Sequence, residues 1–209
     1  MRHERALRTR CALLIARMFL AVAAMALLLS GNMPARVTHA ADITQFTATE
    51  TFDPLGLLGT PVGELLDPGV VTCPGHEPTG NPLQPCPAGS RLTIRDEKFV
   101  SRLESSGPGL SGWMTVELNA NWDADYTGPA WGTFSIALDG GGSWDGTWQG
   151  RRMLEDGTWV IPLHVVGHGT GGTVEGLQFT AVDRIVSVFP NSIAYIGTIE
   201  GRVVDPHAK

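Results

Sequence analysis

The stretch WMTVELNANW, Trp113–Trp122, alternates between apolar and polar side chains. Successive side chains of a β-strand point to opposite faces, so a period of two places one set in a core and the other in water. The stretch therefore predicts a strand with one buried face, made by Met114, Val116, Leu118, Ala120 and Trp122.

Similar patterns occur on both sides of this stretch. The segments DGGG at 139–142 and EDG at 155–157 predict tight hairpin turns, because glycine and aspartate tolerate a positive φ. Pro162 falls inside a predicted strand and favours an edge position or a bulge. A short helical turn is expected near residues 64–66, and about eight strands are predicted at 43–52, 91–100, 113–122, 131–138, 144–153, 158–168, 174–188 and 194–204.

Glycine–threonine pairs precede a large apolar residue at 132–134, 146–148, 157–159 and 197–199. Glycine weakens a strand unless the backbone must curve there or approach another chain closely. Successive antiparallel hairpins with such kinks curl a sheet until it closes, and closure removes the edges at which proteins aggregate. The predicted fold is all-β, a single antiparallel barrel of about eight strands. A two-sheet β-sandwich is the alternative.

The first forty residues predict a secretory signal peptide. Five arginines in residues 1–17 precede the uncharged apolar run Met18–Leu29, and the small residues Thr38 and Ala40 suit a cleavage site after Ala40. The expected location is secreted, periplasmic or otherwise extracytoplasmic, and the alternative is a retained N-terminal anchor. Residues 41–209 would form the single barrel domain.

Charge excludes two classes of partner. Six of the fifteen basic and one of the twenty-one acidic side chains lie in the leader, which leaves nine basic and twenty acidic side chains, a net charge of −11. Such a chain repels nucleic acid and an anionic membrane surface, and no basic stripe offsets the repulsion. We expect no nucleic-acid partner and no stable membrane insertion after cleavage.

Two cysteines, Cys73 and Cys86, remain after cleavage, in the proline- and glycine-rich segment 53–90. An even number of cysteines in an exported chain predicts a disulfide, here one that staples a loop and contributes about 3 kcal/mol. The alternative is a metal site made by Cys73, His76 and Cys86 with Glu77 nearby, although the spacing is not one typical of zinc.

Two glycine-rich segments carry a resemblance to known proteins: GSWDGTWQG at 142–150 and VGHGTGGTVEGL at 166–177. They resemble small bacterial secreted proteins of unassigned function, and the second is similar to an element of allene-oxide-cyclase-like and dirigent-like barrels. The resemblance covers about residues 110–204. It implies a barrel with an apolar cavity, often trimeric, so a homo-oligomer and a small apolar ligand are the partners it implies.

His168 and Glu175 are the weak candidates for catalysis. His168 lies beside glycines at a predicted barrel mouth, where it can bind a ligand or act as a base, and the alternative is an exposed loop histidine. Glu175 is an acid or base if it faces the interior and a solvated side chain if it faces outward. His164 and His168 lie about 13 Å apart on an extended strand, too far to share a metal ion. Asp123 and Asp125 are interpreted as a surface loop.

All six tryptophans lie between Trp113 and Trp159. Trp144 and Trp148 are four residues apart on one predicted strand and therefore share a face. They either fill the core or, with Phe134, line a ligand cavity.

The functional hypothesis is an exported barrel that binds a small apolar or amphipathic molecule without turnover. Phe134, Trp144 and Trp148 would line the pocket, with His168 and Glu175 as polar contacts at its rim. One alternative is a cyclase or isomerase that uses a cavity acid or base. Another is a structural or interaction module of the cell envelope. No cofactor is expected.

Overall fold

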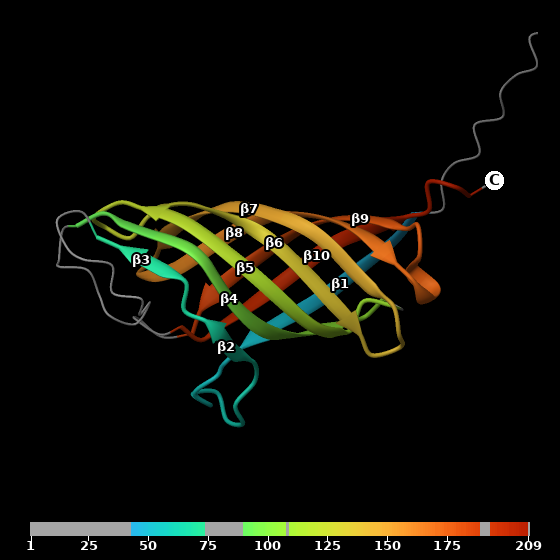
Figure 1. Cartoon of the computed structure of the whole chain (residues 1–209), viewed down its shortest axis with the longest axis horizontal. Helices are drawn as coiled ribbons and strands as arrows, with labels where there is room; N and C mark the ends of the chain where they lie inside the picture. The colour runs from blue at the N-terminus through green and yellow to red at the C-terminus, as the bar shows by residue number, and fades with distance from the viewer. Residues whose placement is uncertain (1–42, 74–89, 108, 189–192, 209) are drawn as a thin grey trace, which may run out of the picture. The chain divides into compact units, whose positions relative to one another are not determined.

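The structure, a computed structural model, describes residues 43–73, 90–107, 109–188 and 193–208 (Figure 1). In this part of the chain, strands dominate and the one helical element is a short 3-10 turn, η1, Gly172–Val174. The strands are β1 (Ile43–Phe52), β2 (Glu64–Asp67), β3 (Val70–Thr72), β4 (Leu92–Ser105), β5 (Gly112–Trp122), β6 (Gly128–Leu138), β7 (Ser143–Glu155), β8 (Thr158–Thr170), β9 (Gln178–Ser187) and β10 (Tyr195–Val204).

Eight of these strands close into an antiparallel barrel. The hydrogen-bonded order is β1-β10-β9-β8-β7-β6-β5-β4, and the ring closes where Ala48–Thr51 of β1 pairs with Arg102–Ser105 of β4. The short strands β2 and β3 pair with the part of the β4 edge that β1 leaves uncovered. The predicted barrel is confirmed, and the sandwich alternative is wrong because one continuous sheet closes on itself.

The eight predicted strands correspond to the eight strands of the ring. Among the first residues of the strands, the largest difference between prediction and structure is in β9. This strand begins at Gln178 rather than residue 174, because η1 occupies the residues before it. The expectation of a helical turn near residues 64–66 is wrong, since these residues form β2. The pairing of Leu65 with Phe99 supplies β2 with backbone partners on the free edge of β4.

Pro162 lies in β8 between two neighbouring strands, so the expected edge position is wrong for a closed ring. The register of β7 and β8 is the same on both sides of this proline, because Gly150 pairs with Leu163 and Met153 pairs with Val160. The expected bulge is therefore also absent from this ladder. Instead, the pairing with β7 is interrupted opposite Pro162, whose ring nitrogen has no hydrogen to donate.

Both predicted hairpin turns are confirmed. Between β6 and β7, Gly141 and Gly142 have a φ of 87°, and the Leu138 nitrogen donates to the Gly142 oxygen at 3.2 Å. Between β7 and β8, Asp156 and Gly157 have φ values of 49° and 80°. In the two-residue β7–β8 turn, two consecutive positive φ values match the right-handed twist of the flanking strands, whereas the β6–β7 loop is longer.

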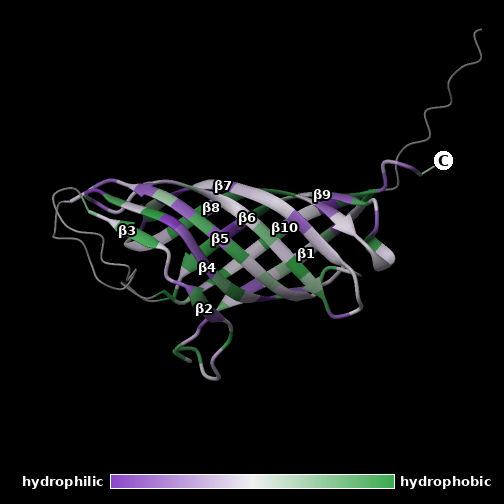
Figure 2. Ribbon diagram, in the orientation of Figure 1, coloured by the Kyte–Doolittle hydropathy of each residue, from purple (hydrophilic) through white to green (hydrophobic). Residues whose placement is uncertain are grey.

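The core lies inside the ring, because every ring strand alternates between inward and outward side chains. Figure 2 shows this alternation as changes between green and purple or white along the strands. In β5, the predicted inward set is confirmed: Met114, Val116 and Ala120 are buried, and Leu118 and Trp122 are half-buried. The pattern on the strands therefore decides which residues face the interior.

One end of the ring is closed by its loops. The indole nitrogen of Trp144 donates to the Gly109 oxygen in the β4–β5 loop at 2.9 Å. Leu110 in the same loop and Val174 in η1 are 2% and 3% exposed, so both loops pack into this end. At the opposite end, where β5, β7 and β9 finish, the inward side chains of Trp122, Ile161 and Ile185 are only half-buried.

The leader and Cys86 lie outside the described residues. Cys73 is buried at 1% exposure, and its disulfide to Cys86 stays a prediction. The alternative metal site also includes His76 and Glu77, which lie outside the described residues. Within the described ranges, no helix has the length and apolar character needed to cross a membrane.

Candidate functional site: a cavity inside the barrel

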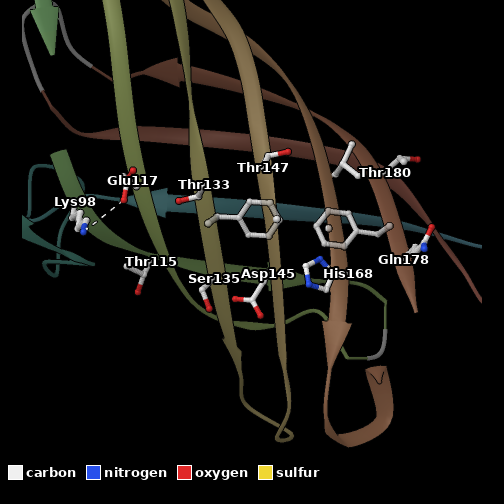
Figure 3. A pocket seen from close by; sticks show the side chains of 15 residues that line it. Lys98, Thr115, Glu117, Thr133, Ser135, Asp145, Thr147, His168, Gln178 and Thr180 are labelled. Carbon is white, nitrogen blue, oxygen red and sulfur yellow. Dashed lines mark ion pairs between the residues drawn. The ribbon is translucent and has the colours of Figure 1, made fainter. Parts of the chain in front are cut away.

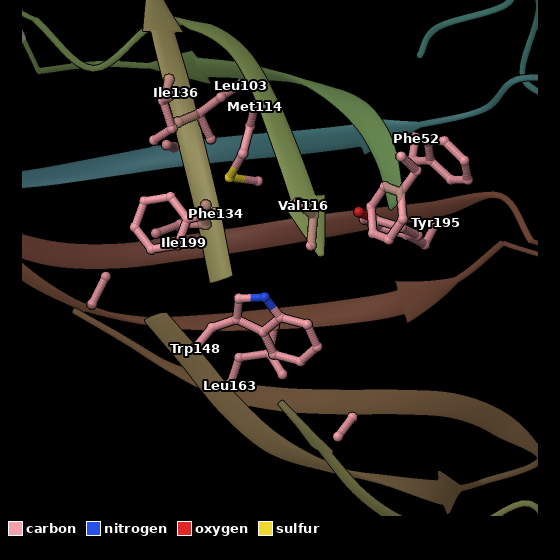
Figure 4. Close-up of a cluster of buried hydrophobic side chains, with 14 of the residues drawn as sticks. Phe52, Leu103, Met114, Val116, Phe134, Ile136, Trp148, Leu163, Tyr195 and Ile199 are labelled. Carbon is pink, nitrogen blue, oxygen red and sulfur yellow. The ribbon is translucent and has the colours of Figure 1, made fainter. Parts of the chain in front are cut away.

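The inward side chains do not fill the ring. They enclose a cavity of about 600 Å³ to which all eight ring strands contribute. Figure 4 shows part of its wall, which includes the side chains of Val116, Phe134, Trp148, Leu163 and Ile199. Most of the wall is apolar or aromatic. Among the described residues that line it, the ionisable ones are Glu50, Glu97, Arg152, Asp183, Tyr126 and Tyr195.

Two carboxyl groups lie in the buried part of this wall. Glu50 on β1 and Asp183 on β9 are each 2% exposed. The hydroxyl of Tyr195 donates a short hydrogen bond to Oε1 of Glu50. Oδ1 of Asp183 and the buried hydroxyl of Ser101 make no hydrogen bond within the described part of the chain. A polar network with unsatisfied atoms inside an apolar cavity is costly to a fold, so it indicates a functional constraint.

Burial favours the protonated form of this carboxyl pair. Burial raises the pKa of Asp183 well above its ordinary value, and the neighbouring Glu50 charge raises that pKa further. Burial also raises the pKa of Glu50, while the hydrogen bond from Tyr195 and the neighbouring polar groups of Ser101 and Asp183 oppose the rise. Two adjacent carboxyl groups cannot both ionise in such a site. The arrangement therefore favours a proton held by the pair, with the pKa raised further at Asp183 by the neighbouring Glu50.

A glycine makes room for the pair. Gly197 on β10 is one of the repeated Gly-Thr glycines, and it lies next to both carboxyl side chains. A Cβ at this position would lie 2.7 Å from Oδ1 of Asp183 and 3.1 Å from Cβ of Glu50. The spacing of glycines that predicted curvature thus also leaves space for these two acids.

Glu97 reaches the cavity through a β-bulge in β4. The register to β5 shifts between Ile94 and Glu97, and Asp96 in the bulge has a φ of 58°. The bulge changes the inward residues of β4 from even to odd numbers, so Glu97 faces inward and Asp96 outward. Burial raises the pKa of Glu97 to about 7, so this carboxyl changes charge near neutral pH.

Arg152 on β7 lies between two tryptophan rings. Its guanidinium carbon is 4.4 Å from the ring centre of Trp122 and 4.3 Å from that of Trp159. The ring of Tyr126 packs edge-on against Trp159 at 6.4 Å between centroids. Burial lowers the pKa of Arg152 to about 10, which leaves it positively charged at neutral pH.

The structure places the predicted pocket residues in different surroundings. Phe134 and Trp148 are buried and line the interior cavity. Trp144 shares a strand face with Trp148, as expected, but it packs at the closed end against Phe179, with 5.0 Å between ring centroids. It is not part of the cavity wall.

His168 and Glu175 lie outside the interior cavity, and both side chains are exposed. His168 lines a hollow on the outer surface of the barrel, shown in Figure 3 with Asp145, Thr147 and Thr180. Asp145 and His168 are cross-strand partners in the β7–β8 pair. Neither residue is therefore a polar contact of the interior cavity, which the sequence hypothesis had assumed. Asp123 and Asp125 are exposed loop residues, as interpreted.

Sequence reasoning missed the ionisable residues that do line the cavity. In β1, one face carries Phe46, Ala48, Glu50 and Phe52, and the other carries threonine and glutamine. This alternation in the sequence predicts an acid, Glu50, on the apolar face. The same alternation holds for Asp183 in β9 and for Arg152, which shares the face of Trp148. Glu97 had no such signal, because a regular strand would have turned it outward.

The fold and the cavity define a class: a closed antiparallel barrel with an interior cavity of ligand size. No protein-family model matches the chain, and neither a curated protein nor a solved structure shows significant similarity to it. In the part of the chain that the structure describes, no group of three histidine, cysteine or acidic side chains is arranged to hold a metal ion.

Proposed function

We propose that this protein binds a small, largely apolar molecule inside its barrel, after export from the cytoplasm. The observation that carries the proposal is the cavity of about 600 Å³ within the ring, walled by aromatic and aliphatic side chains. Cavities of roughly 300–1,000 Å³ are typical of sites for small molecules. Burial of apolar ligand surface contributes roughly 25 cal/mol per Å² before the costs of association.

The interior suits this role better than the hollow that contains His168. The outer hollow is lined mainly by outward polar side chains, including Lys98, Glu117 and Thr133, which are solvated without a ligand. Phe134 and Phe179 also present ring atoms there, because Gly146 and Gly167 have no side chain that would cover these rings. A ligand inside the ring removes far more apolar surface from water.

The test is native mass spectrometry of the protein purified from its own host, in wild-type form and in two variants. Val165 and Val166 are neighbours on β8: Val165 lines the cavity, whereas Val166 is 55% exposed and lines the outer hollow. We expect wild-type protein to retain a small molecule, Val165→Trp to lose it because the indole fills the cavity, and Val166→Trp to keep it.

A retained mass that is lost from Val166→Trp but not from Val165→Trp would contradict the proposal, as would wild-type protein without any retained molecule. Val165→Met, a smaller change, keeps the test valid if the tryptophan variant folds poorly. The intact mass of the same samples also reports cleavage after Ala40 and the expected Cys73–Cys86 disulfide.

A second candidate function is proton transfer, as in an isomerase. It is favoured by the buried pair of Glu50 and Asp183 with the hydroxyl of Tyr195 in the cavity wall. Ionised Glu50 would take a proton from a carbon next to a carbonyl, and protonated Asp183 would donate a hydrogen bond to the carbonyl oxygen. Return of that proton to another carbon completes an isomerisation that needs no cofactor.

Deuterium exchange distinguishes this candidate from simple binding. The protein with its retained molecule is incubated in deuterated water, and the mass of the released molecule is measured. An isomerase incorporates carbon-bound deuterium in the wild type and not in Glu50→Gln. Asp145→Asn, a change on the outer surface, is the control. No exchange in the wild type would leave the protein as a binder without turnover.

A further inference from the structure

Three arginines in the described part of the chain stack on tryptophan rings, and they differ in their other partners. Arg95 lies over Trp131 and Arg102 lies over Trp113, with 5.4 Å and 5.5 Å from the guanidinium carbon to the ring centre. Both pairs are on the outer side of the barrel, where Trp131 and Trp113 are exposed. In contrast, the side chain of Arg152 points into the barrel, where it lies between Trp122 and Trp159.

Oxygen acceptors satisfy the two outer guanidinium groups. Arg95 donates to the backbone oxygens of Ile94 and Ala120 at 2.6 Å and 2.7 Å. Arg102 makes a two-pronged ion pair with Asp139, with nitrogen–oxygen distances of 2.8 Å and 2.6 Å. At both positions the planar guanidinium therefore stacks on a tryptophan ring and also donates hydrogen bonds to oxygen atoms.

Arg152 contacts tryptophan rings but has no oxygen acceptor among the described residues. Among the described residues, no carboxylate, carbonyl or hydroxyl oxygen accepts a hydrogen bond from it, and no acidic group forms an ion pair with it. Its pKa is lowered by burial and raised by Tyr126, and no carboxylate of the described ranges compensates its charge. Among the described residues of the cavity wall, Arg152 is also the one lysine or arginine.

A partly desolvated cation without a counter-ion is costly, and a carboxylate removes that cost by accepting two parallel hydrogen bonds. The two tryptophan rings lie within 4.4 Å of the guanidinium carbon and supply π contacts, which leave the hydrogen-bonding capacity of its nitrogens unused. The fully buried Glu50 and Asp183 oppose a negative group elsewhere in the cavity. A negative head at Arg152 and an apolar tail along the aromatic wall satisfy both conditions.

We infer that the ligand of the cavity is an amphipathic organic anion, whose carboxylate pairs with Arg152 beside Trp122 and Trp159, at the end of the barrel where β5, β7 and β9 finish. This inference rests on the proposed function, since it names the chemical class that the same cavity binds. The site selects a carboxylate head on an apolar chain over the matching neutral or cationic molecule.

The test compares three probes of equal chain length, decanoate, decanol and decylamine, by isothermal titration calorimetry at neutral pH and below micelle-forming concentrations. The wild type is expected to bind decanoate about tenfold or more tightly than decanol, because a charge-assisted pair adds to the same apolar burial. Decylamine is expected to bind most weakly. This comparison needs no variant and is independent of any folding defect.

Variants locate the preference. Arg152→Gln is expected to lose the preference for decanoate and to bind decanol as the wild type does. Arg151→Gln on the outward face of the same strand is expected to keep the preference. Arg152→Lys retains the charge without the planar fork and is expected to keep only part of the preference.

The outcomes separate the two ideas. Equal binding of decanoate and decanol, stronger binding of decylamine, or an unchanged preference in folded Arg152→Gln each overturns the anion inference and leaves the proposed function standing. A wild type that binds none of the probes contradicts the proposed function and the inference together.

Discussion

At the scale of single residues, the carboxyl groups of Glu50 and Asp183 are the main departure from an apolar interior. A barrel selected for stability alone would place aliphatic side chains at both positions. Gly197 leaves the space these acids occupy, and Tyr195 donates to one of them, so the surrounding residues accommodate the pair. Its cost depends on pH, because folding changes the affinity of Asp183 for a proton.

The pair predicts an unusual gain in stability from Asp183→Asn. The folded-state pKa of Asp183 lies above its ordinary value of 3.8, so below that value the folded and unfolded states are both protonated. As pH rises from 3.8 toward the folded-state pKa, only the unfolded state ionises, and the free energy of unfolding of the wild type falls. Asparagine does not ionise, so we expect Asp183→Asn to be more stable than the wild type at neutral pH by about 1–3 kcal/mol.

Urea unfolding at mildly acidic and at neutral pH checks this expectation. The gain from Asp183→Asn should grow as the pH rises, whereas Asp145→Asn on the outer face should show no such growth. A variant that is destabilised equally at both pH values would mean that Asp183 is ionised in the fold, contrary to the described electrostatics.

At the scale of elements, the bulge in β4 controls which side chains enter the cavity. A regular strand from Leu92 through Ile94 would turn Asp96 inward and Glu97 outward. The bulge reverses this by placing Asp96 at a φ of 58°, a conformation that costs most residues about 1–2 kcal/mol. The Asp96 nitrogen donates to Oδ1 of Asn119 on β5 at 3.2 Å, which helps hold the bulge.

Two substitutions at Asp96 are expected to have opposite effects. Asp96→Gly should preserve or raise stability, because glycine adopts a positive φ without strain. Asp96→Val should lower the free energy of unfolding by about 2 kcal/mol, because a β-branched residue opposes that conformation. Thermal melts of both variants measure the difference, and equal stability of the two would show that the bulge is not maintained in solution.

The elements also show how far the sequence predicts this protein. The period-two alternation and the glycine-rich turns predict the ring strands and its two tight hairpins, because both signals are local. The strands β2 and β3 were missed because their stability comes from the distant edge of β4 rather than from their own proline- and glycine-rich residues. The inward orientation of Glu97 also depends on a distant partner, because the bulge that produces it forms through pairing with β5, so the local sequence does not predict it.

At the scale of the whole barrel, the interior is closed by loops at one end and lined by half-buried aromatic residues at the other. Phe134 and Trp148 follow from the sequence as cavity residues, because they lie on the apolar face of their strands. The glycines around His168 and Glu175 indicate a barrel mouth, but the β7–β8 register turns His168 outward and Glu175 lies exposed after η1. The hollow itself depends on how the ring closes and on which side chains meet across it.

The most direct measurement is a crystal structure of the protein with decanoate carrying a bromine at its chain end, located by anomalous scattering. We expect the bromine inside the ring, against the wall formed by Phe134, Trp148 and Leu163, and the carboxylate at Arg152. A bromine found only in the outer hollow beside His168, or an interior closed by its own side chains, would contradict the claim that the barrel is a binding cavity.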